Sequence, residues 1–134
     1  MSAVLVDSNV LLDVVTNDPH WYDWSSQAIA RAEEIGKLVI NPIILAEVSI
    51  GYLNIEDVND AVPSDQFVRE PISDDAAFLA GKAFVLYRRR GGARRAPLPD
   101  FFIGAHAAVA GYRLLTRDPS RFLSYFPKLV VIAP

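Results

Sequence analysis

Two aspartates stand directly after short apolar runs in this 134-residue chain. Asp7 follows the run 3–6, and Asp118 follows the run 114–116 after one intervening residue. Open parallel sheets bind ligands at the carboxyl ends of their strands, so neighbouring strands would aim both side chains into one crevice. Carboxylates gathered in this way suit hard divalent cations such as Mg²⁺ or Mn²⁺.

Two further acids have unusual neighbours. Glu47 interrupts an apolar segment, and on a helix its neighbours three and four residues away include Ile43, Ile44 and Ile50. A lone buried carboxylate is costly, so Glu47 needs a cation or another strong partner. Asp100 falls in the first turn of an expected helix, where the helix dipole favours an anion.

Each of the four acids also has a purely structural explanation when it is taken alone. Asp7 could simply cap a helix, Asp118 could cap a turn, and Glu47 could reach solvent at a helix edge. The agreement of four separate placements favours a shared site instead. Four carboxylates in one crevice repel one another, so we expect their pKa values to be raised in the metal-free protein.

Five of the thirteen basic residues fall within eight positions, namely Arg88, Arg89, Arg90, Arg94 and Arg95. Arginines around a Gly-Gly pair suit a flexible loop that binds the phosphates of a polyanion, although a solvated surface loop is the alternative. Charge is also segregated along the chain: residues 1–67 carry eleven acids and two bases, whereas residues 68–134 carry five acids and eleven bases. Such segregation is typical of proteins with a charged partner.

Composition excludes several kinds of site. The chain has no Cys and two His, which leaves no disulfide, thiol nucleophile or Cys-zinc site. We expect His106 to be packed or partly exposed rather than a ligand, and His20, Asp13 and Asp23 to be solvated. The apolar run 3–6 lacks a basic leader and no segment is long enough to span a bilayer, so we expect a cytoplasmic protein with no membrane contact.

Short apolar runs alternate with longer periodic segments, which predicts an α/β fold built on a parallel sheet in one domain over residues 1–134. Strands are expected at 3–6, 38–40, 67–68, 113–116 and 129–132. A helix is expected from the Asp18-Pro19 cap to Gly36, and a separate helix starts at Ser8 if Asp7 is its cap. Other helices are expected at 41–53, 57–62, 73–90, 98–111 and 119–122, with a loop at 91–97.

With these residues in place, the chain resembles the PIN-domain ribonucleases, specifically the VapC-type toxins of toxin–antitoxin pairs. The resemblance rests on segments 6–12 (VDSNVLL), 41–47 (NPIILAE), 98–105 (LPDFFIGA) and 114–119 (LLTRDP), and on the closing segment 126–134. It implies a three-layer α/β/α sandwich and a divalent-metal-dependent endoribonuclease that leaves 5′-phosphate and 3′-hydroxyl ends. The implied partners are RNA, a VapB-type antitoxin and a second copy of the chain.

The resemblance also implies a catalytic and metal-binding site made of Asp7, Glu47, Asp100 and Asp118, supported by Ser8, Asn9 and Thr116. Asp7 and Asp118 are interpreted as the principal ligands of Mg²⁺ or Mn²⁺, Asp100 as a ligand or water-orienting group, and Glu47 as a second-metal or outer-shell ligand. Ser120 and Arg121 stand where many relatives carry a further acid, which leaves the number of metals open.

Other classes of protein share parts of this pattern. A haloacid-dehalogenase-like phosphatase needs a second Asp where Asn9 stands, and a response-regulator receiver needs paired acids after the first strand and a Lys after the last. A non-catalytic PIN-like module that binds RNA or a partner is the remaining alternative.

Overall fold

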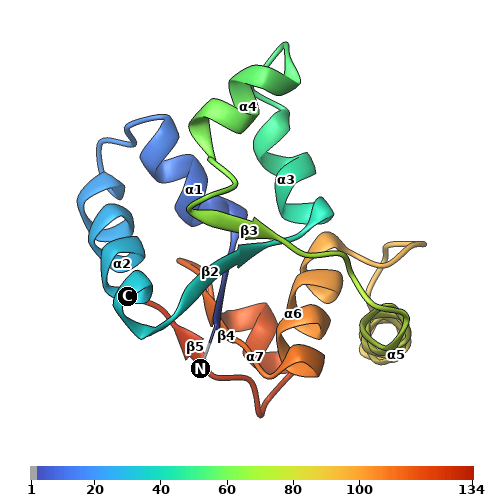
Figure 1. Ribbon diagram of the computed structural model, residues 1–134. Coiled ribbons are helices and arrows are strands. Elements are labelled where there is room, and N and C mark those ends of the chain that lie inside the picture. The colour runs from blue at the N-terminus through green and yellow to red at the C-terminus, as the bar shows by residue number, and fades with distance from the viewer. Residues whose placement is uncertain (1–2) are drawn as a thin grey trace.

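The computed structural model describes residues 3–134 and contains a five-stranded parallel sheet with the order β3-β2-β1-β4-β5 (Figure 1). The strands are β1 (Ala3–Val6), β2 (Lys37–Ile40), β3 (Phe67–Arg69), β4 (Arg113–Leu115) and β5 (Val131–Ile132). The central strand β1 is buried along its whole length, as a continuous apolar run predicts for a strand covered on both faces. The predicted α/β fold with a central parallel sheet is confirmed.

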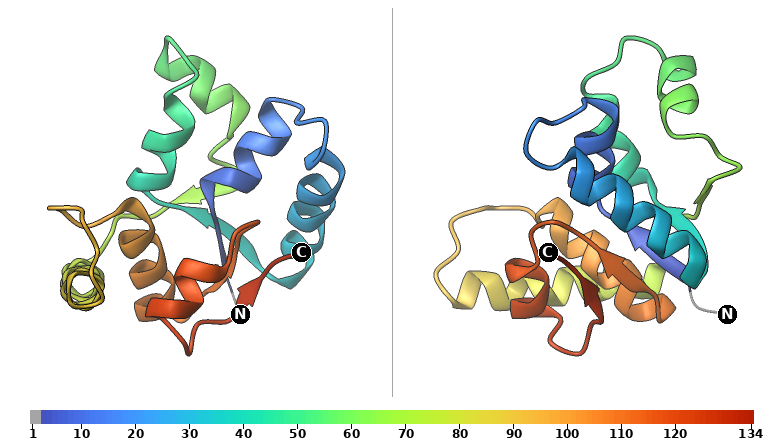
Figure 2. Two further views of the ribbon diagram at one scale, coloured as in Figure 1. Left: turned by 180° about the vertical axis from the view of Figure 1, so that it is seen from behind. Right: turned by 90° about the vertical axis from the view of Figure 1, so that its left-hand side faces the viewer.

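Helices flank both faces of this sheet. They are α1 (Ser8–Val15), α2 (Tyr22–Ile35), α3 (Pro42–Ser49), α4 (Ile55–Ala61), α5 (Asp74–Arg89), α6 (Pro99–Ala110) and α7 (Ser120–Tyr125). Helices α1 and α2 lie on one side, α6 and α7 lie on the other, and α5 packs on the outside of α6 (Figure 2). Helices α3 and α4 extend beyond the carboxyl edge of the sheet (Figure 1). Within residues 3–134, no helix has the length and apolar character needed to cross a membrane.

Three predicted helix ends are confirmed by their caps. The Asn41 side chain accepts a 2.9 Å hydrogen bond from the Ile44 amide and begins α3, and the Ser73 hydroxyl accepts one of 3.1 Å from the Ala76 amide and begins α5. Gly111 ends α6 with φ = 73°, a left-handed conformation that favours glycine.

Two predicted helix boundaries are wrong. Asp18 accepts 2.9 Å hydrogen bonds from the His20 and Trp21 amides, so it caps a turn, and α2 begins only at Tyr22. The helix expected to reach residue 53 ends at Ser49, because the chain turns there before α4 begins.

The close packing of α7 on α6 depends on the glycine at position 104, which has no side chain. A Cβ atom at Gly104 would lie 2.4 Å from the ring of Phe126 and 3.2 Å from that of Phe122. Phe122 is 1% exposed and belongs to the continuous apolar core under this face of the sheet. The two helices therefore approach closely, and α7 is held at a fixed place beside the first turns of α6.

Candidate active site

The carboxyl ends of β1 and β4 lie side by side at the point where the strand order of the sheet reverses direction. The chain proceeds from β1 outward to β3 and then crosses back to β4 on the other side of β1. The Asp7 amide donates a 2.9 Å hydrogen bond to the Leu115 carbonyl and ties the two strand ends together. Such a switch point is the usual ligand-binding crevice of an open α/β sheet.

A pocket of about 330 Å³ opens at this point. All four acids singled out from the sequence line it, and they come from the ends of β1 and β4 and from helices α3 and α6. The full lining is Asp7, Ser8, Asn9, Glu47, Asp100, Asp118, Ser120, Arg121 and Phe122. The structure therefore brings the four carboxylates to one place.

Asp7 is the most buried of the four, with 5% of its surface exposed. Its Oδ1 accepts a 2.8 Å hydrogen bond from the Ser8 amide, so it caps α1, and its Oδ2 accepts one of 2.8 Å from the Thr116 hydroxyl. Burial raises the pKa of Asp7 to about 6 against the lowering effect of these hydrogen bonds, and the charges of Asp100 and Glu47 add to the rise. Asp7 is thus both a helix cap and a pocket carboxylate.

Glu47 projects from the apolar helix α3 and is half-buried. The Ser8 hydroxyl donates a 2.9 Å hydrogen bond to its Oε1, which links Glu47 to the end of β1. Burial raises the pKa of Glu47, and the charge of Asp100 raises it further. A Glu on an apolar helix face was the sequence signal that singled this residue out.

Asp100 and Asp118 complete the acidic lining. Asp100 lies in the first turn of α6, and burial raises its pKa although the nearby Arg121 opposes the rise. The Arg121 Nη1 is 3.7 Å from the Asp100 Oδ2. Asp118 is exposed, and its amide donates a 3.1 Å hydrogen bond to the Thr116 hydroxyl.

The pKa values of Asp7, Glu47 and Asp100 are raised as expected, but the expected cause is incomplete. Burial makes the largest contribution for each of the three, and the charges of the other carboxylates contribute less. Loss of solvent therefore raises the pKa values of these three acids more than repulsion between the carboxylates does.

Thr116 and Asn9 hold the two sides of the pocket together. The Thr116 hydroxyl donates to Asp7 and accepts from the Asn9 side-chain amide at 3.3 Å. The Asn9 Oδ1 accepts a 3.2 Å hydrogen bond from the Arg117 amide. These contacts, with that of Ser8 to Glu47, are of the supporting kind that the sequence resemblance implies.

His106 lies outside the pocket lining and is buried, which is one of the two placements expected for it, packed or partly exposed. Burial lowers the pKa of His106, and the Glu70 carboxylate opposes this effect. Its Nδ1 lies 3.0 Å from the Asn41 side-chain amide nitrogen, and its Nε2 lies 3.5 Å from the Glu70 carboxylate. Because Asn41 caps α3, His106 supports the helix that carries Glu47.

The donor chemistry of the pocket fits a hydrated divalent cation. Its acidic side chains offer only oxygen atoms, which Mg²⁺ and Mn²⁺ prefer. Among residues 3–134, no three His, Cys, Asp or Glu side chains are arranged to hold one metal ion together. Mg²⁺ usually keeps several waters and needs only one or two protein carboxylates, so this spacing suits it.

Two features of the site were missed in the sequence. Asp13, expected to be solvated, is buried and pairs with Arg117. Arg121 was noted as a departure from a family pattern, yet it lines the pocket beside Asp100. The available signals were the four-residue spacing of Asn9 and Asp13, which puts both on one face of α1, and the proximity of Arg121 to Asp118 in the chain.

The arginine-rich segment splits into two groups. Arg88 donates to the Gly92 and Arg94 carbonyls at 3.2 and 2.9 Å, and Arg90 donates to the Ser124 hydroxyl at 3.0 Å. These two side chains hold the loop against itself and against α7. All five side chains are exposed, and three of them form no side-chain hydrogen bond within residues 3–134: Arg89, Arg94 and Arg95.

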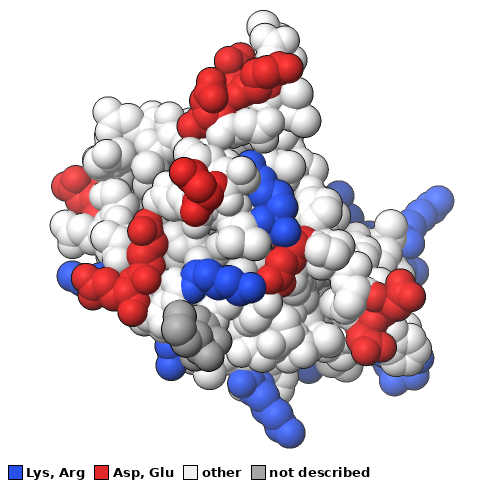
Figure 3. Space-filling model, in the orientation of Figure 1, with Lys and Arg blue, Asp and Glu red and all other residues white. Residues whose placement is uncertain are grey.

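The segregation of charge along the chain is also visible in space. Acidic side chains gather over α4, which carries Glu56, Asp57 and Asp60 (Figure 3). Basic side chains lie at the upper right and along the lower edge of this face, and a second acidic group lies between them on the right (Figure 3). The basic group at the upper right lies beyond α6, where the loop that follows α5 projects (Figure 1).

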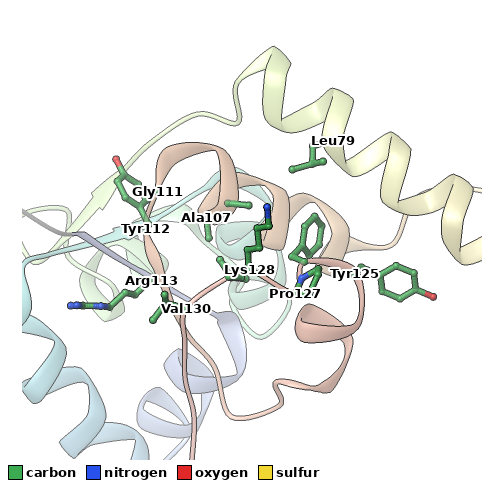
Figure 4. A pocket seen from close by; sticks show the side chains of 12 residues that line it. Leu79, Ala107, Gly111, Tyr112, Arg113, Tyr125, Pro127, Lys128 and Val130 are labelled. Carbon is green, nitrogen blue, oxygen red and sulfur yellow. The ribbon is translucent and has the colours of Figure 1, made fainter.

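A larger pocket, of about 580 Å³, lies at the other end of β4 and is separate from the acids (Figure 4). Its lining is mainly apolar and includes Leu79, Ala107 and Val130. Lys128 lies over it and the Arg113 side chain points away from it (Figure 4). None of its described lining residues is acidic, so the chemistry of a metal site belongs to the smaller pocket.

Comparisons with known proteins agree with this geometry. In fold, the chain is similar to the VapBC2 complex of Rickettsia felis bound to a DNA fragment from its promoter, with 18% identity, a TM-score of 0.71 and 98% of each chain covered. It is also similar to VapBC-1 from nontypeable Haemophilus influenzae, with 18% identity, a TM-score of 0.73, and 98% of this chain and 97% of that chain covered. A toxin–antitoxin complex from Klebsiella pneumoniae is similar at 23% identity and a TM-score of 0.65, with 95% of each chain covered.

At these identities the structural likeness shows the fold alone. No curated protein matches the sequence. The model of the PIN domain family matches residues 4–125, which is most of the chain and spans all four pocket acids. The chain therefore belongs to the PIN domain family.

Proposed function

We propose that this PIN domain is a divalent-metal-dependent endoribonuclease and the toxin of a toxin–antitoxin pair. The observation that carries the proposal is the convergence of four carboxylates, from four separate elements, on one pocket at the switch point of the sheet. Family membership supports nuclease chemistry, and the solved structures of similar fold include VapBC and other toxin–antitoxin complexes.

In this proposal Asp7 and Asp118 are the principal ligands of Mg²⁺ or Mn²⁺, and Glu47 holds a second ion or a water of the first. A bound ion would supply positive charge at the reacting phosphate and lower the pKa of a nearby water. Asp100 orients the attacking water and accepts its proton, a role for which a raised pKa is suitable. Thr116 and Asn9 keep the ends of β1 and β4 in register.

Hydrolysis of the phosphodiester by water gives the expected 5′-phosphate and 3′-hydroxyl ends. The substrate is a polyanion, so the carboxylates alone would repel it. The exposed arginines of the 88–95 segment are proposed to bind flanking phosphates and offset this repulsion. The site is thus negative where it needs a cation and positive where it needs RNA.

The proposed partners are a VapB-type antitoxin and a second copy of the chain. An Arg or Lys side chain of the antitoxin could compete for the pocket carboxylates and block the site. Expression of the chain alone in a bacterial host is expected to stop growth, and co-expression of the adjacent short gene product is expected to restore it. Unhindered growth with abundant soluble protein would contradict the toxin proposal.

The decisive experiment is an RNA cleavage assay with the purified chain. Total RNA is incubated with Mg²⁺, with Mn²⁺ or with excess chelator, and the cleavage sites are mapped. Cleavage is expected only with metal, and Asp7→Asn, Asp100→Asn or Asp118→Asn should each reduce the rate by orders of magnitude. Asp65→Asn, which changes an exposed acid outside the pocket, is the matched control. Full cleavage in excess chelator would overturn the proposal.

A non-catalytic PIN-like module that binds RNA or a partner is the second candidate. It is favoured by the ion pair between Arg121 and Asp100, which engages one of the pocket carboxylates. RNA binding without cleavage in either metal would select it. A haloacid-dehalogenase-like phosphatase has no support, because the Asn9 side chain is engaged by Thr116 and Arg117 and the family match is to PIN domains.

A further inference from the structure

We propose that Arg121 is a substrate-binding residue of the acidic pocket, which binds an RNA phosphate and pairs with Asp100 when RNA is absent. The inference rests on the proposed function for the identity of the polyanion. It adds to that function a specific cationic side chain inside the pocket, distinct from the arginine-rich loop.

Arg121 occupies the same pocket as the four acids. It is the one basic residue in the described lining, and its side chain is 46% exposed, so it is accessible from solvent. The Nη1 atom lies 3.7 Å from the Asp100 Oδ2. A cation at this place meets any phosphate that approaches the carboxylates.

The guanidinium of Arg121 has donors to spare. A separation of 3.7 Å is an ion pair but is too long for a hydrogen bond, and no side-chain hydrogen bond is formed by Arg121 in the described part of the chain. By contrast, Arg117 is engaged by Asp13 and Arg90 by Ser124. The planar guanidinium fork matches the oxygens of a phosphate, so Arg121 is equipped to bind one bidentately.

The fold fixes the position of Arg121. Asp100 and Gly104 lie four residues apart and therefore on one face of α6. The lack of a side chain at Gly104 lets α7 pack closely through Phe122, which is the neighbour of Arg121 in the chain. The proximity of Arg121 to Asp100 is thus built into the packing of two helices.

This arrangement couples RNA binding and metal binding with opposite signs. Arg121 attracts phosphate, so its loss weakens RNA binding. Arg121 also partly neutralises Asp100, so its loss leaves the pocket more negative and strengthens the binding of a divalent cation. A residue with a purely structural role would not improve one property while impairing the other.

RNA binding is tested in an Asp7→Asn background, in which cleavage is blocked. A fluorescently labelled, mixed-sequence single-stranded RNA oligonucleotide is titrated by anisotropy across a range of salt concentrations. Addition of Arg121→Ala is expected to weaken binding about 10-fold, the effect of one lost charge-assisted contact. The slope of log affinity against log salt should fall by about 0.7. Arg121→Lys should retain most of the slope because the charge remains.

Metal binding is tested without RNA. Mg²⁺ is titrated into the metal-free wild-type chain and into Arg121→Ala by calorimetry. The variant is expected to bind Mg²⁺ about 2- to 5-fold more tightly, the strength of an exposed ion pair. Lys128→Ala removes one positive charge at the separate apolar pocket and should change neither Mg²⁺ nor RNA binding. Thermal melting of each variant verifies that it is folded.

The outcomes separate this inference from the proposed function. If Arg121→Ala binds RNA with the affinity and salt slope of Lys128→Ala, the role of Arg121 is wrong. If Arg121→Ala loses RNA affinity but the wild-type chain cleaves RNA in neither metal, the nuclease proposal is wrong and the role of Arg121 stands.

Discussion

The guanidinium of Arg117 makes two hydrogen bonds to the carboxylate of Asp13, from Nε to Oδ2 at 2.8 Å and from Nη2 to Oδ1 at 3.0 Å. Asp13 is 3% exposed and also accepts a 2.7 Å hydrogen bond from the Ser25 hydroxyl. Arg117 stands between Thr116 and Asp118 in the chain. The ion pair therefore fastens the loop that carries Asp118 to helices α1 and α2.

Loss of one partner of this ion pair should destabilise the fold. Asp13→Ala leaves Arg117 without its carboxylate and is expected to lower the free energy of unfolding by about 3 kcal/mol, measured in urea. Cleavage should also fall, because Asp118 loses the anchor of its loop. Asp65→Ala removes an exposed acid and should stay within about 0.5 kcal/mol of wild type.

A double variant distinguishes two causes of lost stability, the unpaired charge of Arg117 and the lost packing of the two side chains. Asp13→Leu with Arg117→Met replaces both charges by apolar groups and should recover most of the lost stability. Cleavage should recover with it if the role of the pair is to position the loop. An unchanged urea midpoint in Asp13→Ala would show that the pair does not support the fold.

Local signals predicted the elements of the fold well. The apolar runs predicted the strands, and the cap residues Asn41, Ser73 and Gly111 predicted helix ends. These predictions succeed because a cap residue interacts with backbone groups only a few residues away in the chain. The Asp18-Pro19 pair was wrongly predicted to begin a helix, because a local capping signal does not distinguish a helix from a turn. Its hydrogen bonds are real, but they close a turn, and the helix begins three residues after Pro19.

Contacts between distant residues were beyond such signals. Asp13 and Arg117 are 104 residues apart, and Asn41 and His106 are 65 apart, so their pairing depends on how the strands are ordered. The four pocket acids were predictable because each has a telling local context. The burial that dominates their pKa values was not, because it depends on the assembled helices.

The raised pKa of Asp7 makes the stability of the metal-free protein depend on pH. A folded pKa of about 6 against an ordinary value of 3.8 means that the folded state favours the protonated carboxyl. The resulting stabilisation is present below pH 3.8 and is lost as the pH rises through about 6. The raised pKa values of Glu47 and Asp100 act in the same direction.

The contribution of Asp7 is isolated by comparison with Asp7→Asn in the presence of chelator. The free-energy difference between the two proteins should change by about 2.4 kcal/mol between pH 4 and pH 7, at about 1.36 kcal/mol per pKa unit. The wild-type chain should lose stability relative to the variant as the pH rises. A difference that is constant with pH would show that Asp7 ionises normally. Asp65→Asn controls for the general effect of an acid-to-amide change.

Divalent metal should stabilise the folded chain whether or not RNA is cleaved. Mg²⁺ that binds only the folded form at about 100 times its Kd adds about 2.7 kcal/mol, which corresponds to roughly 10 °C in melting temperature for a chain of this size. Asp7→Asn should show little of this shift, and Lys128→Ala should show all of it, because Lys128 lies at the other pocket. Equal shifts in the wild type and Asp7→Asn would place the bound metal elsewhere.

The arginines of the 88–95 segment should fall into two functional groups, those that form side-chain hydrogen bonds and those that do not. The triple variant Arg89→Ala, Arg94→Ala and Arg95→Ala removes exposed side chains and should leave the melting temperature unchanged. If these side chains bind phosphates, RNA affinity should fall and the slope of log affinity against log salt should drop by about 2, at about 0.7 per lost contact. Arg90→Ala, by contrast, removes the contacts to Ser124 and Tyr125 and should lower the melting temperature slightly.

Anisotropy titrations and melting curves on both variants test whether the two groups of arginines have these different roles. A triple variant with the wild-type salt slope would mean that the segment is only a solvated surface.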